Sequence, residues 1–322
     1  MKAVVIDGYG GPEVLNVRDV PVPEITEDQV LVKVKAAGIN PADWKIREGY
    51  LAKAFPHKLP LTPGWELSGI VEAVGNKGCS FKPGDEVYAY VRLETVQFGT
   101  YAEFAPADAS MLAIKPAKLS FSDAATIPLT VLTAWQAMVD FAALQAGESV
   151  FVTAGAGGVG GFAIQIAKHL GARVCAAASP HNHDYLRSLG ADEVIDYRQD
   201  DIKASIETFA TEGVDFVFDC TGREDVAINF DYVRKNYGRV ATINGLVHTV
   251  AELEKNAAKH NVAAKLIVVE PDGKQLSAIS KLIETGKIKP LPVETFPMAQ
   301  VKEALQKSQN GHVRGKLALI IS

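Results

Sequence analysis

Residues 149–161 have the sequence SVFVTAGAGGVGG, in which a short apolar run leads into a glycine-rich loop. The glycines at positions 155, 157 and 160 satisfy the pattern G-x-G-x-x-G, and a run with helical periodicity, Phe162–Leu170, follows directly. Between a strand and a helix, this pattern binds the pyrophosphate of a dinucleotide; without that context it can be a flexible loop. The residues that we expect at the dinucleotide are Gly155, Gly157, Gly158, Val159 and Gly160.

Backbone freedom explains why the predicted site needs these glycines. The first permits a tight turn, the second lets the chain approach the pyrophosphate, and the third lets helix pack against strand. The helix N-terminus adds N–H donors and a positive partial charge, and both favour phosphate.

Apolar strands alternate with helical segments along the middle of the chain. The predicted strands are Ser149–Thr153, Arg173–Ala178, Glu193–Ile195, Phe216–Asp219, Arg239–Ile243 and Leu266–Val269. The predicted helices are Phe162–Leu170, Asp184–Leu189, Ile202–Ala210 and Val226–Val233. This alternation predicts an α/β fold with a parallel, doubly wound sheet.

The first 120 residues follow a different pattern, because short β-branched runs are separated there by glycine and proline. The runs are Met1–Ile6, Val30–Ala36, Ser68–Val74 and Glu86–Val91, and they predict a barrel or sandwich. Helices are predicted from a capping residue at Ser122 and over Val131–Phe141. After Pro271 we expect a helix, a strand, a helix and a strand at Gly273–Thr285, Leu291–Phe296, Ala299–Lys307 and Lys316–Ile321.

The bulk composition limits the possible partners. The chain has 322 residues, 48% of them hydrophobic and 22% charged, with a net charge of −5. No basic block favours nucleic acid, and no run of about 18 apolar residues could span a membrane. The three cysteines are far apart in sequence, so they predict neither a disulfide framework nor a metal knuckle. A cytoplasmic protein is the simplest expectation.

The end of the second predicted strand indicates which dinucleotide binds. An NAD site places an acidic residue there for the ribose hydroxyls, but this strand continues from Ala178 to Ser179 and reaches no acid before Asp184. A 2′-phosphate would therefore meet no carboxylate. Because Ser179, His181, Tyr197 and Arg198 could offer hydrogen bonds or positive charge, NADPH is the predicted cofactor.

Several segments together resemble the medium-chain dehydrogenase/reductase superfamily, and within it the zinc-free quinone oxidoreductase and enone reductase branch. The matching segments are residues 37–43 (AGINPAD), 63–69 (PGWELSG), 84–87 (GDEV), 101–104 (YAEF), 128–135 (PLTVLTAW), the glycine loop, 189–192 (LGAD), 194–197 (VIDY) and 315–316 (GK). The resemblance implies a GroES-like catalytic domain of residues 1–124 and 271–322, into which a Rossmann domain of residues 125–270 is inserted. It also implies a homodimer formed by strand pairing near Leu266–Val269.

Zinc-dependent members carry a catalytic cysteine where this chain has Asn40, and a histidine where it has Trp65 before Glu66. A catalytic zinc needs about three converging protein ligands. With two of them replaced, no zinc is expected.

The resemblance also implies roles for individual residues. Asn40 and Lys45 are the predicted catalytic pair, with alternatives of an Asx turn before Pro41 and a solvated surface lysine. Asp43 could orient this pair or cap a helix. Trp44 and Trp65 could line a substrate site, although a place in the core is the favoured interpretation of each. The further residues expected at the cofactor are Asn40, Thr133, Ser179, Tyr197, Cys220, Asn244, Gly245, Leu246 and Lys316.

Without a metal, the hydride acceptor is expected to be conjugated. Hydride delivery to an isolated carbonyl builds an alkoxide that usually needs a Lewis acid, whereas an enone or quinone delocalises the charge. The sequence therefore predicts an NADPH-dependent reductase of quinones or α,β-unsaturated carbonyls. The alternatives are a non-catalytic NADPH-binding structural or regulatory protein, and a reductase of enoyl groups on acyl-CoA-type carriers, for which no cationic cluster is evident.

Overall fold

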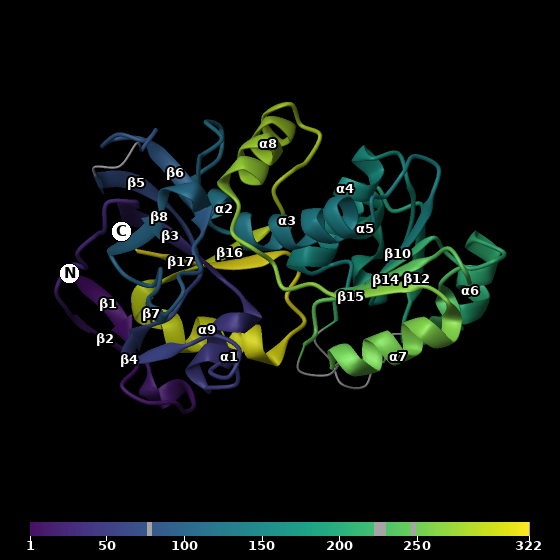
Figure 1. Cartoon of the computed structure of the whole chain (residues 1–322), viewed down its shortest axis with the longest axis horizontal. Coiled ribbons are helices and arrows are strands. Elements are labelled where there is room, and N and C mark those ends of the chain that lie inside the picture. The colour runs from purple at the N-terminus through teal and green to yellow at the C-terminus, as the bar shows by residue number, and fades with distance from the viewer. Residues whose placement is uncertain (76–78, 222–229, 246–248, 322) are drawn as a thin grey trace. The chain divides into compact units, whose positions relative to one another are not determined.

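The computed structural model describes residues 1–75, 79–221, 230–245 and 249–321. The chain divides into two compact units, which are described separately below. Unit 1 consists of Met1–Leu132 and Glu270–Ser322, and unit 2 consists of Thr133–Val269. The division proposed from the sequence, at 124/125 and 270/271, differs from this one by eight residues at the first boundary and one at the second. In Figure 1, unit 1 contains the purple, blue and yellow segments, and unit 2 contains mainly teal and green ones.

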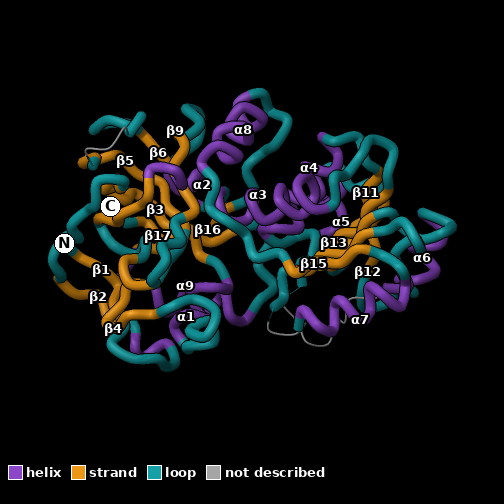
Figure 2. The backbone as a smooth tube through the Cα atoms, in the orientation of Figure 1, coloured by secondary structure: helices purple, strands orange, loops and turns teal. Residues whose placement is uncertain are grey.

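Unit 1 is built on a seven-stranded sheet among the described residues, with the order β16-β17-β3-β5-β6-β9 and with β8 paired to β3. Its strands are β3 (Gln29–Ile39), β5 (Glu66–Val74), β6 (Glu86–Tyr90), β8 (Phe104–Asp108), β9 (Leu112–Ile114), β16 (Val293–Pro297) and β17 (Lys316–Ile320). Two small sheets pair β1 (Lys2–Val5) with β2 (Asn16–Asp19) and β4 (His57–Thr62) with β7 (Val96–Phe98). The predicted β-rich character of this unit is confirmed (Figure 2).

The helices of unit 1 connect these strands. They are η1 (Pro12–Val14), α1 (Pro41–Arg47), η2 (Ala109–Met111), α2 (Phe121–Ala125), α8 (Gly273–Glu284), η6 (Met298–Gln300) and α9 (Val301–Asn310). The predicted cap at Ser122 is wrong, because Ser120 accepts the capping hydrogen bond from the Asp123 amide. The predicted helix Val131–Phe141 begins earlier, as α3 (Pro128–Trp135), and continues as the π-helix η3 (Gln136–Phe141).

Unit 2 contains the predicted parallel sheet, with six described strands in the order β12-β11-β10-β13-β14-β15. The strands are β10 (Ser149–Val152), β11 (Arg173–Ala178), β12 (Glu193–Asp196), β13 (Phe216–Asp219), β14 (Arg239–Thr242) and β15 (Ala263–Leu266). The connecting helices are α4 (Gly158–His169), η4 (Pro180–Asn182), α5 (His183–Leu189), α6 (Ile202–Phe209), η5 (Phe230–Tyr232) and α7 (Val250–His260). The strand order changes direction at β10, which is where such sheets bind ligands.

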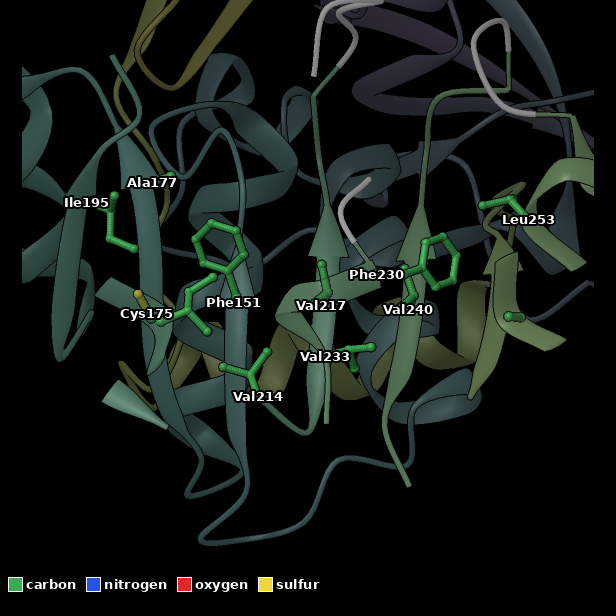
Figure 3. Close-up of a cluster of buried hydrophobic side chains, with 12 residues drawn as sticks. Phe151, Cys175, Ala177, Ile195, Val214, Val217, Phe230, Val233, Val240 and Leu253 are labelled. Atoms are coloured by element: carbon green, nitrogen blue, oxygen red, sulfur yellow. The ribbon is translucent and has the colours of Figure 1, made fainter. Parts of the chain in front are cut away.

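A buried apolar cluster covers one face of this sheet (Figure 3). Phe151, Val217 and Val240 come from three adjacent strands, and Leu253 comes from α7. Helical side chains such as Ile206 fill the layer above them. This packing fixes the strands, so the residues at their carboxyl ends are held in place.

Three predictions for unit 2 need correction. The last strand is Ala263–Leu266 rather than Leu266–Val269, because Asn261 ends α7 in the left-handed conformation (φ 53°) and the chain joins β14 two residues later. A helix was predicted over Val226–Val233. Its first four residues lie outside the described residues, and Phe230–Tyr232 is a 3-10 turn. Helix α7 was not predicted, although Thr249 and Glu252 form the capping box that marks its start.

Candidate functional site

The glycine loop lies between β10 and α4, as predicted, and at two of its glycines an added side chain would meet close neighbours. A Cβ on Gly160 would lie 2.4 Å from the Ala154 carbonyl oxygen, and one on Gly155 would lie 2.9 Å from Leu186 Cδ2. A Cβ on Gly157 would meet nothing closer than 3.4 Å. Gly157 is the N-cap of α4, so its bare backbone leaves space at a helix N-terminus that can receive phosphate.

Hydrogen bonds join the carboxyl ends of the neighbouring strands. Asp219 accepts from Thr153 Oγ1 at 2.9 Å and from Thr242 Oγ1 at 2.8 Å, and the Asn244 amide donates to Thr242 at 3.1 Å. The Asn244 side chain is buried, and within the described structure neither its Oδ1 nor its Nδ2 has a partner. Buried polar atoms are rarely left unpaired, since each costs about 1–3 kcal/mol. A ligand with hydrogen-bonding groups fits this edge.

A second group of donors lies at the end of β11. Ser179 is buried, and its hydroxyl lies 3.5 Å from the Tyr197 hydroxyl. Arg198 Nε donates to the same tyrosine oxygen at 3.2 Å, and its guanidinium lies 5.4 Å from the tyrosine ring centre. The neighbouring Asp196 carboxylate accepts from the Arg198 amide at 3.1 Å. The hydroxyls and guanidinium can bind an anionic group such as a 2′-phosphate.

The other residues expected at the cofactor differ in their surroundings. The Cys220 amide donates to Thr153 Oγ1 at 2.8 Å, and desolvation, followed by the nearby Asp219 carboxylate, raises the pKa of the Cys220 thiol well above its usual value. This thiol is therefore a poor nucleophile. Thr133 is buried, and Gly245 is exposed after the end of β14. Leu246 lies outside the described residues.

In unit 1, Asn40 follows β3 and is the N-cap residue of α1, but its side chain makes no capping bond. Instead, Nδ2 donates to Glu66 Oε2 at 2.7 Å, and Oδ1 accepts from Lys316 Nζ at 2.6 Å. The alternative of an Asx turn is therefore not supported.

The side chains of Glu66 and Lys316 are both buried. Lys316 Nζ also donates to Glu66 Oε2 at 3.0 Å and to the Ile39 carbonyl at 3.2 Å. The other carboxylate oxygen of Glu66 accepts from the Leu129 amide at 2.6 Å, at the start of α3. An ammonium has three hydrogens, and these contacts use all three.

Asp43 is fully buried at the third position of α1, where its side chain takes part in a capping box with the N-cap residue Asn40. Its Oδ2 accepts from the Asn40 amide and from the Tyr101 hydroxyl, both at 2.7 Å, whereas Oδ1 has no partner in the described structure. Desolvation raises the pKa of Asp43 to about 7, even though both hydrogen bonds oppose the shift. Asp43 can therefore change its charge near neutral pH.

Lys45 is partly buried on α1, and desolvation lowers the pKa of its ammonium. Its Nζ lies 5.5 Å from the Trp44 ring centre, and Tyr50 packs edge-on against the same ring. The alternative of a fully solvated surface lysine does not fit this burial. Trp65 is buried edge-on against Phe55 and Tyr90, as the core interpretation expects.

Comparison with known proteins places this architecture in a family. Residues 26–117 match the alcohol dehydrogenase GroES-like domain, and residues 189–319 match the family described as zinc-binding dehydrogenase. The chloroplastic NADPH-dependent alkenal/one oxidoreductase of Arabidopsis thaliana is 38% identical over 99% of this chain and 79% of its own length. The chain belongs to the medium-chain dehydrogenase/reductase superfamily.

Other members of the superfamily indicate the branch. The 2-methylene-furan-3-one reductase of Solanum lycopersicum is 34% identical, with 99% of this chain and 79% of that protein covered. The solved structure of the quinone oxidoreductase from Coxiella burnetii has a TM-score of 0.89 at 32% identity, over 100% of this chain and 99% of that one. This chain therefore lies in the quinone oxidoreductase and enone reductase branch of the medium-chain dehydrogenase/reductases.

Sequence reasoning did not assign Glu66, Tyr101 or Asp219 to this medium-chain reductase's site. One signal for Glu66 was available, because a carboxylate that follows Trp65 and precedes an apolar strand is expected to be paired. Tyr101 gave no local signal, since Asp43 lies 58 residues away in sequence, and the contacts of Asp219 that join neighbouring strands span 66 and 23 residues.

Proposed function

We propose that this protein transfers hydride from NADPH to a quinone or an α,β-unsaturated carbonyl, without zinc. The observation that carries the proposal is the cluster of Ser179, Tyr197 and Arg198 at the end of β11, which has hydroxyl and guanidinium donors where an NAD site has a carboxylate. The relative named NADPH-dependent alkenal/one oxidoreductase supports the same choice.

The residues of unit 2 fit an NADPH molecule. The space at Gly157 and the N-terminus of α4 would take the pyrophosphate, and the unpaired Asn244 side chain would bind a polar group of the cofactor. Ser179, Tyr197 and Arg198 would hold the 2′-phosphate. When bound, NADPH supplies the hydride for the reaction.

The residues of unit 1 do not fit a catalytic zinc. An amide at Asn40 and an indole at Trp65 stand at two of the expected ligand positions, and neither is a usual zinc ligand. No group of three His, Cys, Asp or Glu that could hold a metal occurs in the described ranges. The family description as zinc-binding therefore does not transfer to this chain.

Hydrogen-bond donors of unit 1 can stabilise a delocalised enolate or phenolate. One N–H of the Asn40 amide is used by Glu66, so the second is available to an oxygen that gains charge. Burial lowers the pKa of the Lys45 ammonium, which makes it a better proton donor than an exposed lysine would be. In the overall reaction, the conjugated acceptor gains a hydride at carbon and a proton.

The proposal is tested by NADPH oxidation, followed by absorbance, with a panel of quinones and enones. Turnover is expected with some of them, and Lys45→Met should reduce kcat without a change in NADPH affinity. If NADPH stabilises the protein thermally but no acceptor is reduced, the non-catalytic alternative is correct.

Assembly and location stay predictions. We propose a homodimer through the sheet edge at β15, which analytical ultracentrifugation would test by a mass near twice 34.5 kDa. None of the described helices is long and apolar enough to cross a bilayer. A cytoplasmic location is a proposal from cysteine usage alone.

A further inference from the structure

The strand registers of unit 1 bring three distant side chains together. β17 runs antiparallel to β3 with Leu317 opposite Ile39, so the next pair in the same register is Lys316 and Asn40. β5 runs antiparallel to β3 on its other side. A Cβ on Gly38 would lie 2.4 Å from Glu66 Oε2, so this glycine gives the Glu66 carboxylate room to reach Asn40. The arrangement is therefore built into the sheet.

The charges of Glu66 and Lys316 determine how the Asn40 amide is oriented. An ammonium only donates hydrogen bonds and an ionised carboxylate only accepts them. The amide oxygen must therefore face Lys316, at 2.6 Å, and the amide nitrogen must face Glu66, at 2.7 Å. Reversing the amide would place donor against donor and acceptor against acceptor, and burial would make both contacts costly.

We propose that the Lys316 ammonium is the resident cation of this site, where zinc-dependent relatives hold a metal, and that its role is to position the Asn40 amide. The description of the family as zinc-binding disagrees with the residues present, and the lysine explains the disagreement. A metal ion would have to displace a buried ammonium with three acceptors, and it would find one carboxylate, one amide and one carbonyl. The catalytic consequence rests on the function proposed above for Asn40.

Lys316 is thus a positioning residue rather than a direct cofactor ligand. Its three hydrogens are committed to Ile39, Asn40 and Glu66, which leaves none for the cofactor contact that the sequence predicts. It acts through Asn40, whose remaining N–H it directs.

Three variants separate positioning from simple charge balance: Lys316→Met, Glu66→Gln, and the two together. Each single substitution leaves one buried charge unpaired and should lower the melting temperature, whereas the double variant should recover most of the loss. Because the double variant still lacks the donor that faces Asn40 Oδ1, kcat should stay at least about tenfold below wild type with little change in KM for NADPH. The matched control is Lys115→Met with Glu86→Gln, a second buried lysine and its partner at 3.1 Å, which should leave kcat unchanged.

A readout that needs no turnover separates this inference from the proposed function. The side-chain amide signals of Asn40 in a nitrogen-15 NMR spectrum, identified by their loss in Asn40→Ala, should shift in the double variant and stay in place in the control. Wild-type protein incubated with zinc and then dialysed should contain far less than one zinc per chain by elemental mass spectrometry. Recovery of kcat together with melting temperature, unmoved Asn40 signals, or stoichiometric zinc would each overturn the proposal.

Discussion

The Tyr101 hydroxyl donates a hydrogen bond to Asp43 Oδ2 at 2.7 Å, and both side chains are completely buried. Desolvation raises the pKa of Asp43 from 3.8 to about 7 in the folded protein. A raised folded-state pKa favours the fold at low pH, so this contribution is complete below pH 3.8 and is lost as pH rises through 7. Between pH 3.8 and pH 7, the free energy of unfolding of the wild type should therefore fall by ~4 kcal/mol relative to that of Asp43→Asn. Denaturation of both proteins across pH measures the difference, and a constant difference would contradict the assignment.

Removal of the Tyr101 hydroxyl should have an effect that depends on pH. Tyr101→Phe removes a hydrogen-bond donor to the charged form of Asp43. We therefore expect the free energy of unfolding to fall by about 1–3 kcal/mol at about pH 8, where Asp43 is charged, and by less at about pH 5. Tyr88→Phe is the control, because the buried Tyr88 hydroxyl is hydrogen-bonded to Ser280 Oγ at 2.7 Å. The fall in the free energy of unfolding that this variant causes should be the same at both pH values. Equal pH dependence in the two variants would show that Asp43 does not titrate there.

The glycine loop gives two predictions that differ in their effect on stability. Gly157→Ala adds a Cβ with no close contact, so the apo protein should keep its melting temperature while NADPH affinity falls by about tenfold or more. Gly160→Ala places a Cβ 2.4 Å from a backbone oxygen and should lower both melting temperature and affinity. Thermal shift with and without NADPH measures both quantities. If Gly157→Ala leaves NADPH affinity unchanged, the pyrophosphate does not bind at this loop.

Coenzyme preference should be reversible at the end of β11. Ser179→Asp introduces a carboxylate beside Tyr197, where it would repel a 2′-phosphate and accept from ribose hydroxyls. KM for NADPH should rise by roughly 10- to 100-fold with little change for NADH. Ser179→Ala serves as the control for loss of the hydroxyl alone. If KM for NADPH and KM for NADH change by the same factor in Ser179→Asp, the 2′-phosphate does not bind beside this residue.

The features that could be predicted from sequence are local. The glycine loop, the strand before it and the helix after it lie within 22 residues, 149–170, and their signals reinforce one another. Ser179 was predicted at the end of its strand because strand periodicity alone locates that end. The fold class followed for the same reason, since it depends on alternation along the chain.

The features that sequence could not give are contacts between distant segments. Lys316 and Glu66 are 250 residues apart, and no periodicity says that β17 and β5 flank the same strand. For this reason the Asn40 side chain could be interpreted as a local turn, when long-range pairing had given it two charged partners. The edge strand β15 was misplaced by three residues because the apolar run after Leu266 resembles a strand, while pairing with β14 begins at Ala263.

The division of unit 1 into two chain segments has a consequence for biosynthesis. A ribosome delivers Asn40 and Glu66 well before Lys316, which lies 276 residues after Asn40. All six described strands of the unit 2 sheet have been synthesised by Leu266, so that sheet can form first. Until residue 316 has emerged, the nascent chain holds the Glu66 carboxylate without its cation, and β3 lacks its neighbour β17.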